Sequence, residues 1–147
     1  MIDVQKDGRN LVITIEGVDP FVIRPLPGHA GRQITDTYLK VTAGVGEPSE
    51  LTAALQIAVD GGVLDGDRWV PRPEAEQTNF NRLGMELSQE EGELIIMPAF
   101  FWNTILGMDG VRAYVEGGEG LAGTLKAARA LTARLGLLVQ RTSPSSD

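Results

Sequence analysis

The sequence predicts a mainly α-helical α+β fold, in which a small N-terminal antiparallel sheet precedes a helical body. Apolar and polar residues alternate in the first 25 positions, whereas from residue 28 onward the apolar residues recur at helical spacing. A third observation is the uncharged run 94–108, whose Pro98 predicts a central apolar helix that is kinked or split there. One domain is expected, with a β-hairpin region (1–27), a helical body (28–138) and a disordered polar tail (139–147).

The N-terminal strands are predicted from alternation and from turn residues. In NLVITIEG (10–17), the side chains that share one face are those of Leu11, Ile13 and Ile15. The stretch FVIRP (21–25) follows after a turn and is expected to pair with it as a hairpin. Asp7-Gly8 is a further tight-turn signal, so residues 2–5 are expected to add a third strand and complete a meander.

The helical body is expected to begin with helices at 28–44 and 47–59, the second with Pro48 in its first turn. Residues 60–77 are rich in Gly, Asp and Pro and predict a loop. A short helix is expected within residues 74–87.

The apolar run has its own start signal. Ser88 with Glu91 three positions on is a capping box, which predicts a helix start at about residue 89. Asp109 is expected to cap a further short helix that extends through Tyr114.

The last helix is predicted for residues 119–137, with Gly136 as its C-terminal stop. From their spacing, the residues expected to face inward are Leu121, Leu125, Ala128 and Leu135.

Composition excludes several classes of function. The 147-residue chain has a formal net charge of −7 and scattered basic residues, which argues against nucleic-acid binding. The absence of cysteine excludes disulfides and thiolate metal sites, and His29 alone cannot build a multi-histidine site, so no metal centre and no cofactor are expected. The N-terminus has no apolar signal region, and a cytoplasmic compartment is expected.

A membrane role is also not expected. Fifteen uncharged residues in helical conformation, 94–108, extend about 22 Å, whereas the hydrocarbon core of a bilayer is about 30 Å thick. Acidic residues flank the run on both sides. A helix that is buried in the protein or faces a partner is the remaining interpretation.

Two glycine-rich stretches resemble ligand-binding loops. Residues 118–123 match G-x-G-x-x-G, but they are expected to follow a helix, whereas the dinucleotide fingerprint follows a strand, so a flexible helix–helix joint is predicted. Asp60, Asp65 and Asp67 crowd a loop of the kind that calcium favours, but the EF-hand order is absent. An ordinary solvated loop is therefore expected.

Other candidate residues have simple structural interpretations. A cluster of glutamates could supply acid–base pairs, but it surrounds a helix start where negative charge is stabilising; its members are Glu86, Glu90, Glu91 and Glu93. His29, between glycines, is expected in a turn. Trp69 is expected to pack its loop onto the body, with a binding anchor as the alternative.

The three consecutive aromatics Phe100, Phe101 and Trp102 are the strongest candidates for a partner surface. Three adjacent helical positions cover about 200° of arc, so burying all three requires a helix that is covered on every side. Two interpretations stay open, a central helix or a surface for a partner or for self-association. For the second, the partner-binding residues would also include Ile105 and Met108.

The stretches LVITIEGVDPFVIRPLPG (11–28), TNFNRLG to KAARAL (78–131) and RTSPS (141–145) resemble the tail assembly chaperones of siphophages that infect actinobacteria. The resemblance runs from Asn10 to Ser145, and PAFFWNTILGMDGV (98–111) is its most distinctive part. This part is a pattern of apolar and small residues rather than a catalytic signature.

The resemblance implies a mainly helical, non-enzymatic protein of the host cell cytoplasm that is absent from the mature virion. It implies binding to the tape measure protein while the tail tube polymerises, contact with the tail tube protein, a longer form made by frameshifting, and self-association. A tape measure protein has amphipathic helices that a groove lined by Phe101, Trp102, Ile105 and Met108 could accept.

Two alternatives belong to other classes. A structural phage tail or head–tail joining protein would need a larger sheet than the single N-terminal one that is predicted here. A small metal-dependent hydrolase would have to use the carboxylates of Asp60 to Asp67, and the motifs expected for such an enzyme are absent.

Overall fold

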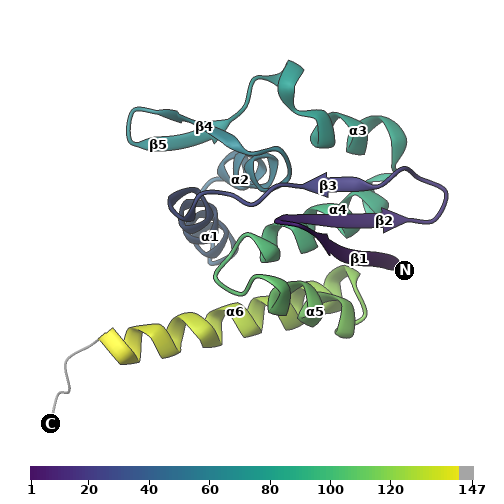
Figure 1. Ribbon diagram of the computed structural model, residues 1–147. Coiled ribbons are helices and arrows are strands. Elements are labelled where there is room, and N and C mark those ends of the chain that lie inside the picture. Colours follow the sequence, from purple (N-terminus) through teal and green to yellow (C-terminus); the bar gives the residue numbers. More distant parts are fainter. Residues whose placement is uncertain (143–147) are drawn as a thin grey trace, which may run out of the picture.

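The computed structural model describes the backbone of residues 1–142 and the side chains of residues 1–137. Its N-terminal part is a three-stranded antiparallel sheet in the order β1-β2-β3, formed by β1 (Ile2–Asp7), β2 (Asn10–Ile15) and β3 (Phe21–Ile23) (Figure 1). The predicted hairpin and the predicted third strand are both confirmed. The face that alternation predicts is buried, with Leu11 and Ile13 fully covered.

Two long helices follow the sheet. They are α1 (Gly28–Thr42) and α2 (Pro48–Asp60). Glu47 is the N-cap residue of α2. Its carbonyl oxygen accepts the Glu50 N–H at 3.0 Å, and the Glu50 carboxylate accepts the Glu47 N–H at 3.0 Å. Both helices agree with the sequence prediction within a few residues.

The predicted loop at 60–77 is wrong in its first part. The chain forms a hairpin there, with β4 (Gly62–Asp65) antiparallel to β5 (Arg68–Pro71). Its turn is centred on Gly66, which has a positive φ of 69° and supplies the conformation that a tight hairpin needs. The short helix η1 (Glu74–Glu76) then leads to α3 (Thr78–Glu86), which confirms the expected short helix.

The apolar run forms α4 (Gln89–Trp102), and the predicted capping box at its start is confirmed. The Ser88 Oγ accepts the Glu91 N–H at 3.1 Å, and the Glu91 carboxylate accepts the Ser88 N–H at 3.0 Å. Pro98 lies inside α4 and does not split it, because the helix continues for four more residues. A kink at Pro98 stays a prediction.

The chain turns at residues 103–107 and re-enters a helix as α5 (Met108–Glu116), with Asp109 in its first turn. Gly107 rather than Asp109 occupies the N-cap position, with φ of 55°. The uncharged run 94–108 therefore does not form one helix, and the candidate residues Ile105 and Met108 do not lie on α4 with Phe100, Phe101 and Trp102.

The last helix, α6 (Gly120–Thr142), differs from the prediction in its end and in its buried face. It continues past Gly136, so the predicted tail is described only from residue 139 to residue 142, as helix, and its last five residues lie outside the described part. Leu121 and Leu125 are exposed rather than buried, whereas Ala127 and Leu131 are the fully buried side chains among residues 120–137.

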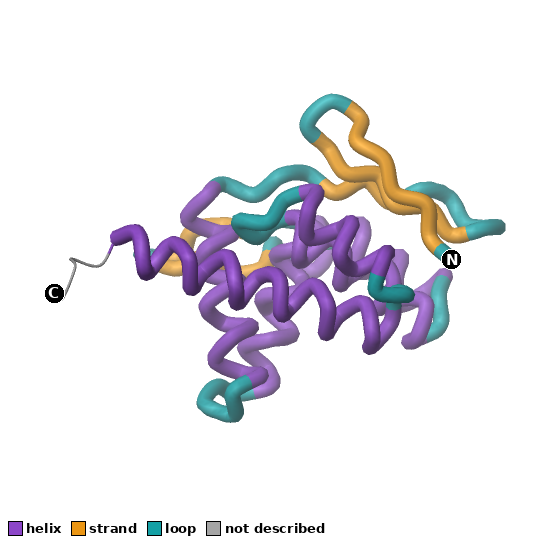
Figure 2. The backbone as a smooth tube through the Cα atoms, turned by 90° about the horizontal axis from the view of Figure 1, so that it is seen from below, coloured by secondary structure: helices purple, strands orange, loops and turns teal. Residues whose placement is uncertain are grey.

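The hydrophobic core is one cluster in which α4 is central. Helix α4 contacts α2, α3, α5, α6 and β2, so other elements surround it on nearly all sides. Figure 1 shows α3 and the β4–β5 hairpin at one end of the molecule and α6 at the other. Seen from below, α6 lies in front of the body and runs across it (Figure 2). The predicted fold class, mainly helical with a small antiparallel sheet, is confirmed.

Candidate partner-binding surface

Phe100 and Phe101 are core residues, and the expectation that they line a surface is corrected. Both side chains are fully buried. They pack against Tyr38 of α1, with ring centroids 4.7 Å (Phe100) and 6.1 Å (Phe101) from the tyrosine ring, and 5.2 Å from each other. The tilted and edge-on angles are those that aromatic quadrupoles prefer. Burial also raises the pKa of the Tyr38 hydroxyl above its ordinary value.

The remaining three candidates keep some surface. Trp102 and Met108 are partly buried and pack against the core, whereas Ile105 is 48% exposed. Ile105 lies in the turn between α4 and α5, which lets its side chain point outward while its neighbours Thr104 and Leu106 are buried. The candidate surface at this turn is therefore Trp102, Ile105 and Met108.

Asn103 holds this turn in place. Its Oδ1 accepts the Leu26 N–H at 3.0 Å, and its Nδ2 donates to the carbonyl oxygens of Ala58 and Ala99, each at 3.2 Å. Helix α1 also comes very close, since a Cβ at Gly31 would lie 2.6 Å from the Asn103 carbonyl oxygen. One amide side chain thus ties the turn to three separate segments.

Close packing on the other side of the turn adds to its rigidity. The Thr104 hydroxyl donates to the Phe101 carbonyl oxygen at 2.6 Å and accepts the Leu106 N–H at 3.3 Å. A Cβ at Gly110 would lie 3.0 Å from the Phe101 carbonyl oxygen, so glycine allows α5 to cross the end of α4. Ile105 is therefore presented on a fixed support, which reduces the entropy that a partner would have to remove.

A second exposed apolar surface lies on α6 and was not predicted. Its leucines are exposed to 76% (Leu121), 49% (Leu125) and 54% (Leu137). The sequence carried a signal for it, since α6 contains Lys126, Arg129, Arg134 and Arg141 and no acidic residue in an otherwise acidic chain. A solvated helix normally carries charges of both signs, so the purely basic charge of α6 is a sign that this helix has an unusual exposed face.

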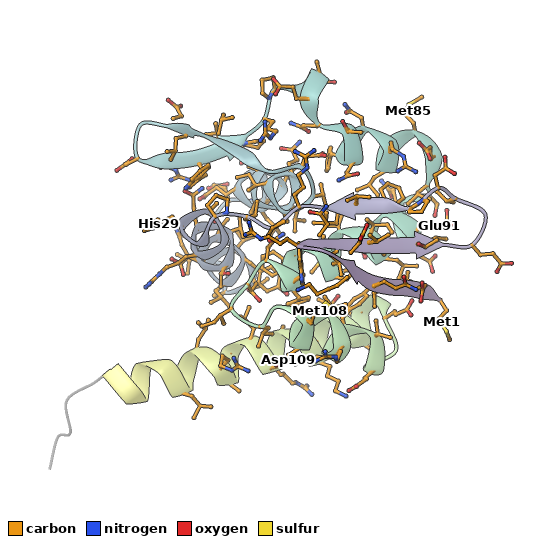
Figure 3. The ribbon with its side chains drawn as sticks, in the orientation of Figure 1. Met1, His29, Met85, Glu91, Met108 and Asp109 are labelled. Carbon is orange, nitrogen blue, oxygen red and sulfur yellow. The ribbon has the colours of Figure 1, made fainter. Side chains whose placement is uncertain are left out.

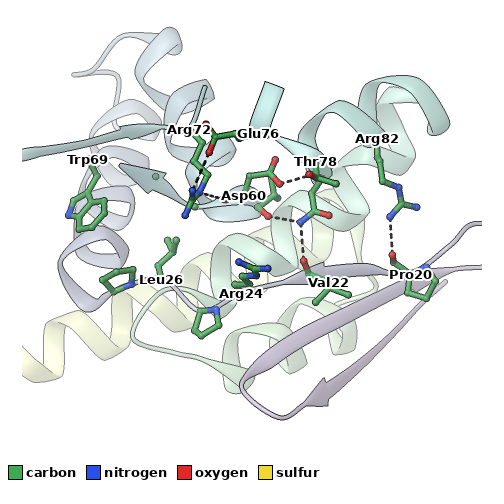
Figure 4. A pocket seen from close by; sticks show the side chains of 16 residues that line it. Pro20, Val22, Arg24, Leu26, Asp60, Trp69, Arg72, Glu76, Thr78 and Arg82 are labelled. Carbon is green, nitrogen blue, oxygen red and sulfur yellow. Dashed lines mark hydrogen bonds and ion pairs between the residues drawn. The ribbon is translucent and has the colours of Figure 1, made fainter. Parts of the chain in front are cut away.

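A cleft of about 630 Å³ lies between the end of β3, the end of α2, the β4–β5 hairpin and α3 (Figure 4). Asp60 stands at its base and caps α3 from outside, because its carboxylate accepts the N–H groups of Asn79 and Phe80, both at 2.7 Å. Burial raises the pKa of Asp60, and these two bonds and the charge of Arg72 oppose the rise.

Side chains of α3 also cover the free edge of β3. The Asn79 amide donates to the Val22 carbonyl oxygen at 3.0 Å, and Arg82 donates to those of Pro20 and Asp19, both at 2.9 Å. Arg82 stacks over the Phe21 ring at 4.0 Å. An uncovered edge invites pairing with another chain, and α3 blocks this one.

The three aspartates that resemble a calcium-binding loop lie in different parts of the structure, and the solvated loop expected for them is partly a hairpin. Asp60 is used as the α3 cap, whereas Asp65 and Asp67 lie at the tip of the β4–β5 hairpin. Within the described part of the chain, no group of three or more His, Cys, Asp or Glu residues is placed to hold a metal ion.

The G-x-G-x-x-G stretch joins α5 to α6, as predicted, and follows a helix rather than a strand. A Cβ at Gly123 would collide with the Tyr114 carbonyl oxygen, so this glycine serves the close packing of the two helices. Glu119 has a positive φ of 59°, and its carboxylate accepts the Ile2 N–H at 3.2 and 3.3 Å. The stretch therefore connects α6 to the first strand.

The other singled-out residues have structural positions. His29 is exposed and projects from the first turn of α1 (Figure 3), not from a loop turn. Trp69 lies on β5 and packs against the core, and Gln33 bonds both its N–H (2.9 Å) and its carbonyl oxygen (2.8 Å). Of the glutamates, Glu86 binds Arg82 through both carboxylate oxygens, at 2.9 and 3.0 Å.

No helix of residues 1–142 is both long enough and apolar enough to cross a bilayer. Comparison of the chain with protein-family models, with curated proteins and with solved structures finds no match. Inference about function therefore rests on the residues of the chain and on their geometry.

Proposed function

We propose that the protein is a non-catalytic tail assembly chaperone that binds the tape measure protein in the host cytoplasm while the tail tube polymerises, and that is left out of the mature virion. The resemblance of residues 10–145 to the tail assembly chaperones of siphophages supports this role. The observation that carries it in the structure is the rigid turn 103–107, which exposes Ile105 at a position between the partly buried Trp102 and Met108 in the sequence.

A partner of this turn would gain a preformed apolar contact. Ile105 already has the exposure and the fixed support of an interface anchor, whereas the aromatics behind it are committed to the core. A helix of the tape measure protein with an apolar stripe is the kind of ligand that such a contact suits.

The test is co-purification with the tape measure protein encoded in the same genome. Ile105→Ser should reduce the recovered complex roughly tenfold, as expected for an anchor residue. Met85→Ser is the matched control, because Met85 is 87% exposed and lies on α3, far from the turn in Figure 3. Ile105→Ser is preferable to Trp102→Ala, which would also remove packing against the core.

Two results would count against the proposal. If the wild-type chain does not recover the tape measure protein at all, the proposed function is wrong. If Ile105→Ser and Met85→Ser both recover as much as wild type, the turn is not the contact. Thermal unfolding of each variant by circular dichroism checks that the fold is retained.

A further inference from the structure

The outward side of α6 is unusually apolar for a solvated helix. Leu121 and Leu125 are exposed about one turn apart on this side. Leu137, also exposed, lies about three and a third turns after Leu125, so its side chain is rotated by about 120° from that of Leu125 around the helix axis. The small residues Ala122 and Ala133 are exposed on the same side. Because all of these side chains are outside, they add nothing to the core of the protein itself.

The inward side of α6 is already filled. Ala127 and Leu131 are fully buried, and Gly123 sits against the Tyr114 carbonyl oxygen of α5. A rotation of α6 that buried Leu121 and Leu125 would lift these three residues off α5. Leu121 and Leu125 therefore cannot be buried by a simple rotation of α6 within the protein.

The charges of α6 indicate what could cover this side. All four ionisable side chains of the helix are basic, although the chain as a whole has a formal net charge of −7. Lys126 and Arg134 pair across to α5, with Glu116 and Asp109, each at 3.7 Å. Arg129 is exposed about one helical turn after Leu125. Its side chain forms no ion pair with any side chain of residues 1–137.

We infer that the outward side of α6 binds an amphipathic helix of another protein, one whose apolar stripe is bordered by Asp or Glu side chains. Leucines on α6 would pack against the stripe, and Arg129, with Lys126, would meet the carboxylates. This inference rests on the proposed function and deepens it, since it specifies the chemistry of the helical partner. The 23-residue α6, about 34 Å long, could accept a partner helix of several turns.

Charge complementarity favours such a helix over two other occupants. A second copy that docked α6 on α6 would bring the Arg129 and Lys126 cations of both chains together. A membrane-surface helix separates its leucines from its cations, whereas here Arg129 lies among the exposed leucines.

The two candidate surfaces lie close to each other. Asp109, at the start of α5, pairs with Arg134 of α6, so the turn that carries Ile105 is next to the C-terminal half of α6. In Figure 3, Met108 and Asp109 stand just above α6. A partner helix on α6 could reach Ile105 with its end.

The test uses a fluorescently labelled synthetic 24-residue helical peptide, with leucines at a and d positions and glutamates beside them, titrated with the full chain. A second peptide with lysine at each glutamate position is its control. The glutamate peptide should bind at least about tenfold more tightly than the lysine peptide. Leu121→Ser with Leu125→Ser should weaken binding roughly tenfold, and Met85→Ser should leave it unchanged.

Charge reversal makes the test specific. Arg129→Glu should weaken the glutamate peptide and strengthen the lysine peptide by about fivefold each, whereas Arg68→Glu, on the distant β4–β5 hairpin, should change neither. Circular dichroism of each variant confirms that α6 is still formed.

Several outcomes would overturn the inference. They are equal binding of the two peptides, α6 variants that bind like wild type, and dimerisation that the leucine variants abolish in light scattering. Binding of vesicles containing 30% phosphatidylserine that is lost with the same variants would assign the surface to membranes instead. If α6 binds the glutamate peptide as expected but the tape measure protein is never recovered, the proposed function fails and the inference stands. If the tape measure protein is recovered equally by the leucine variants, the inference fails and the function stands.

Discussion

Helices α4 and α6 are both rich in apolar residues, yet the structure treats them in opposite ways. Helix α4 has no charged side chain between Leu94 and Trp102 and is surrounded by five other elements. Helix α6 carries four basic side chains, and among its residues 120–137 three leucines are exposed. The protein itself covers the helix whose last nine residues are uncharged, α4, and it leaves apolar side chains exposed on α6, whose charges are all positive.

The difference changes where a partner is expected. The aromatics of α4 looked like surplus apolar surface, but Tyr38 and the surrounding helices bury Phe100 and Phe101 completely. Leu121 and Leu125 of α6 looked like core residues, but the small residues Gly123 and Ala127, together with Leu131, occupy the buried side instead. Large apolar side chains thus do not by themselves identify the buried face of a helix.

The largest effect is expected from truncating the core of α4. Phe100→Ala or Phe101→Ala should lower the free energy of unfolding by about 3–5 kcal/mol, because each leaves a cavity in a packed aromatic cluster. Denaturant titration followed by fluorescence measures it. A loss below about 1 kcal/mol would show that the ring is not part of the core and would undo the contrast with α6.

The next largest change in stability is expected at Gly123 of α6, and Gly136 of the same helix provides the comparison. Gly123→Ala should destabilise by about 1–3 kcal/mol, because a Cβ there collides with the Tyr114 carbonyl oxygen. Gly136→Ala, where a Cβ meets nothing within 4 Å, should stabilise by about 0.5–1 kcal/mol through helix propensity. Changes of the same sign at both positions would contradict the assignment of inward and outward sides.

A similar or smaller effect is expected at Asp60, the cap of α3, which lies at the end of the molecule away from α6. Asp60→Ala should cost about 1–2 kcal/mol, because the N–H groups of Asn79 and Phe80 lose their acceptor. Asp60→Asn keeps one acceptor and should cost less.

The pH dependence of Asp60 has a definite sign. Because burial raises its pKa in the fold, the folded protein binds this proton more tightly than the unfolded chain does. Stability should therefore fall as pH rises through the interval above the ordinary carboxyl pKa. The stability of wild type relative to Asp60→Asn should fall as pH rises above the ordinary carboxyl pKa of Asp60. A difference that rises instead would mean that the helix cap outweighs burial.

The smallest stability effect is expected for Leu121→Ser and Leu125→Ser, within about 0.5 kcal/mol of wild type, because both side chains are exposed. Thermal unfolding of these variants beside Phe100→Ala measures the contrast directly. A loss above about 2 kcal/mol would place the leucines in the core, which would remove the reason to expect a partner on α6.

Local signals in the sequence predicted the fold well. The alternation that buries Leu11 and Ile13, and the capping pair Ser88 and Glu91, depend on neighbours within a few residues. The β4–β5 hairpin was missed because its glycines and aspartates suggested a loop, although Asp65-Gly66 between apolar pairs was a hairpin signal.

The candidate site was less predictable, because it depends on tertiary contacts. The burial of Phe100 and Phe101 requires Tyr38, which comes from a helix far away in the sequence. The inward side of α6 was decided by how closely its backbone approaches Tyr114, a property of small residues that apolar periodicity does not report. Asn103, which holds the turn, has no signature in the sequence at all.

The most direct test of the account is hydrogen–deuterium exchange of the full chain with and without the tape measure protein. Exchange should slow at residues 103–108 and along α6, since backbone amides covered by a partner open less often. The β4–β5 hairpin and α3 should exchange as in the free protein. If exchange slows only in the cleft between α3 and the β4–β5 hairpin, and is unchanged at residues 103–108 and along α6, the proposed location of the partner surface is wrong.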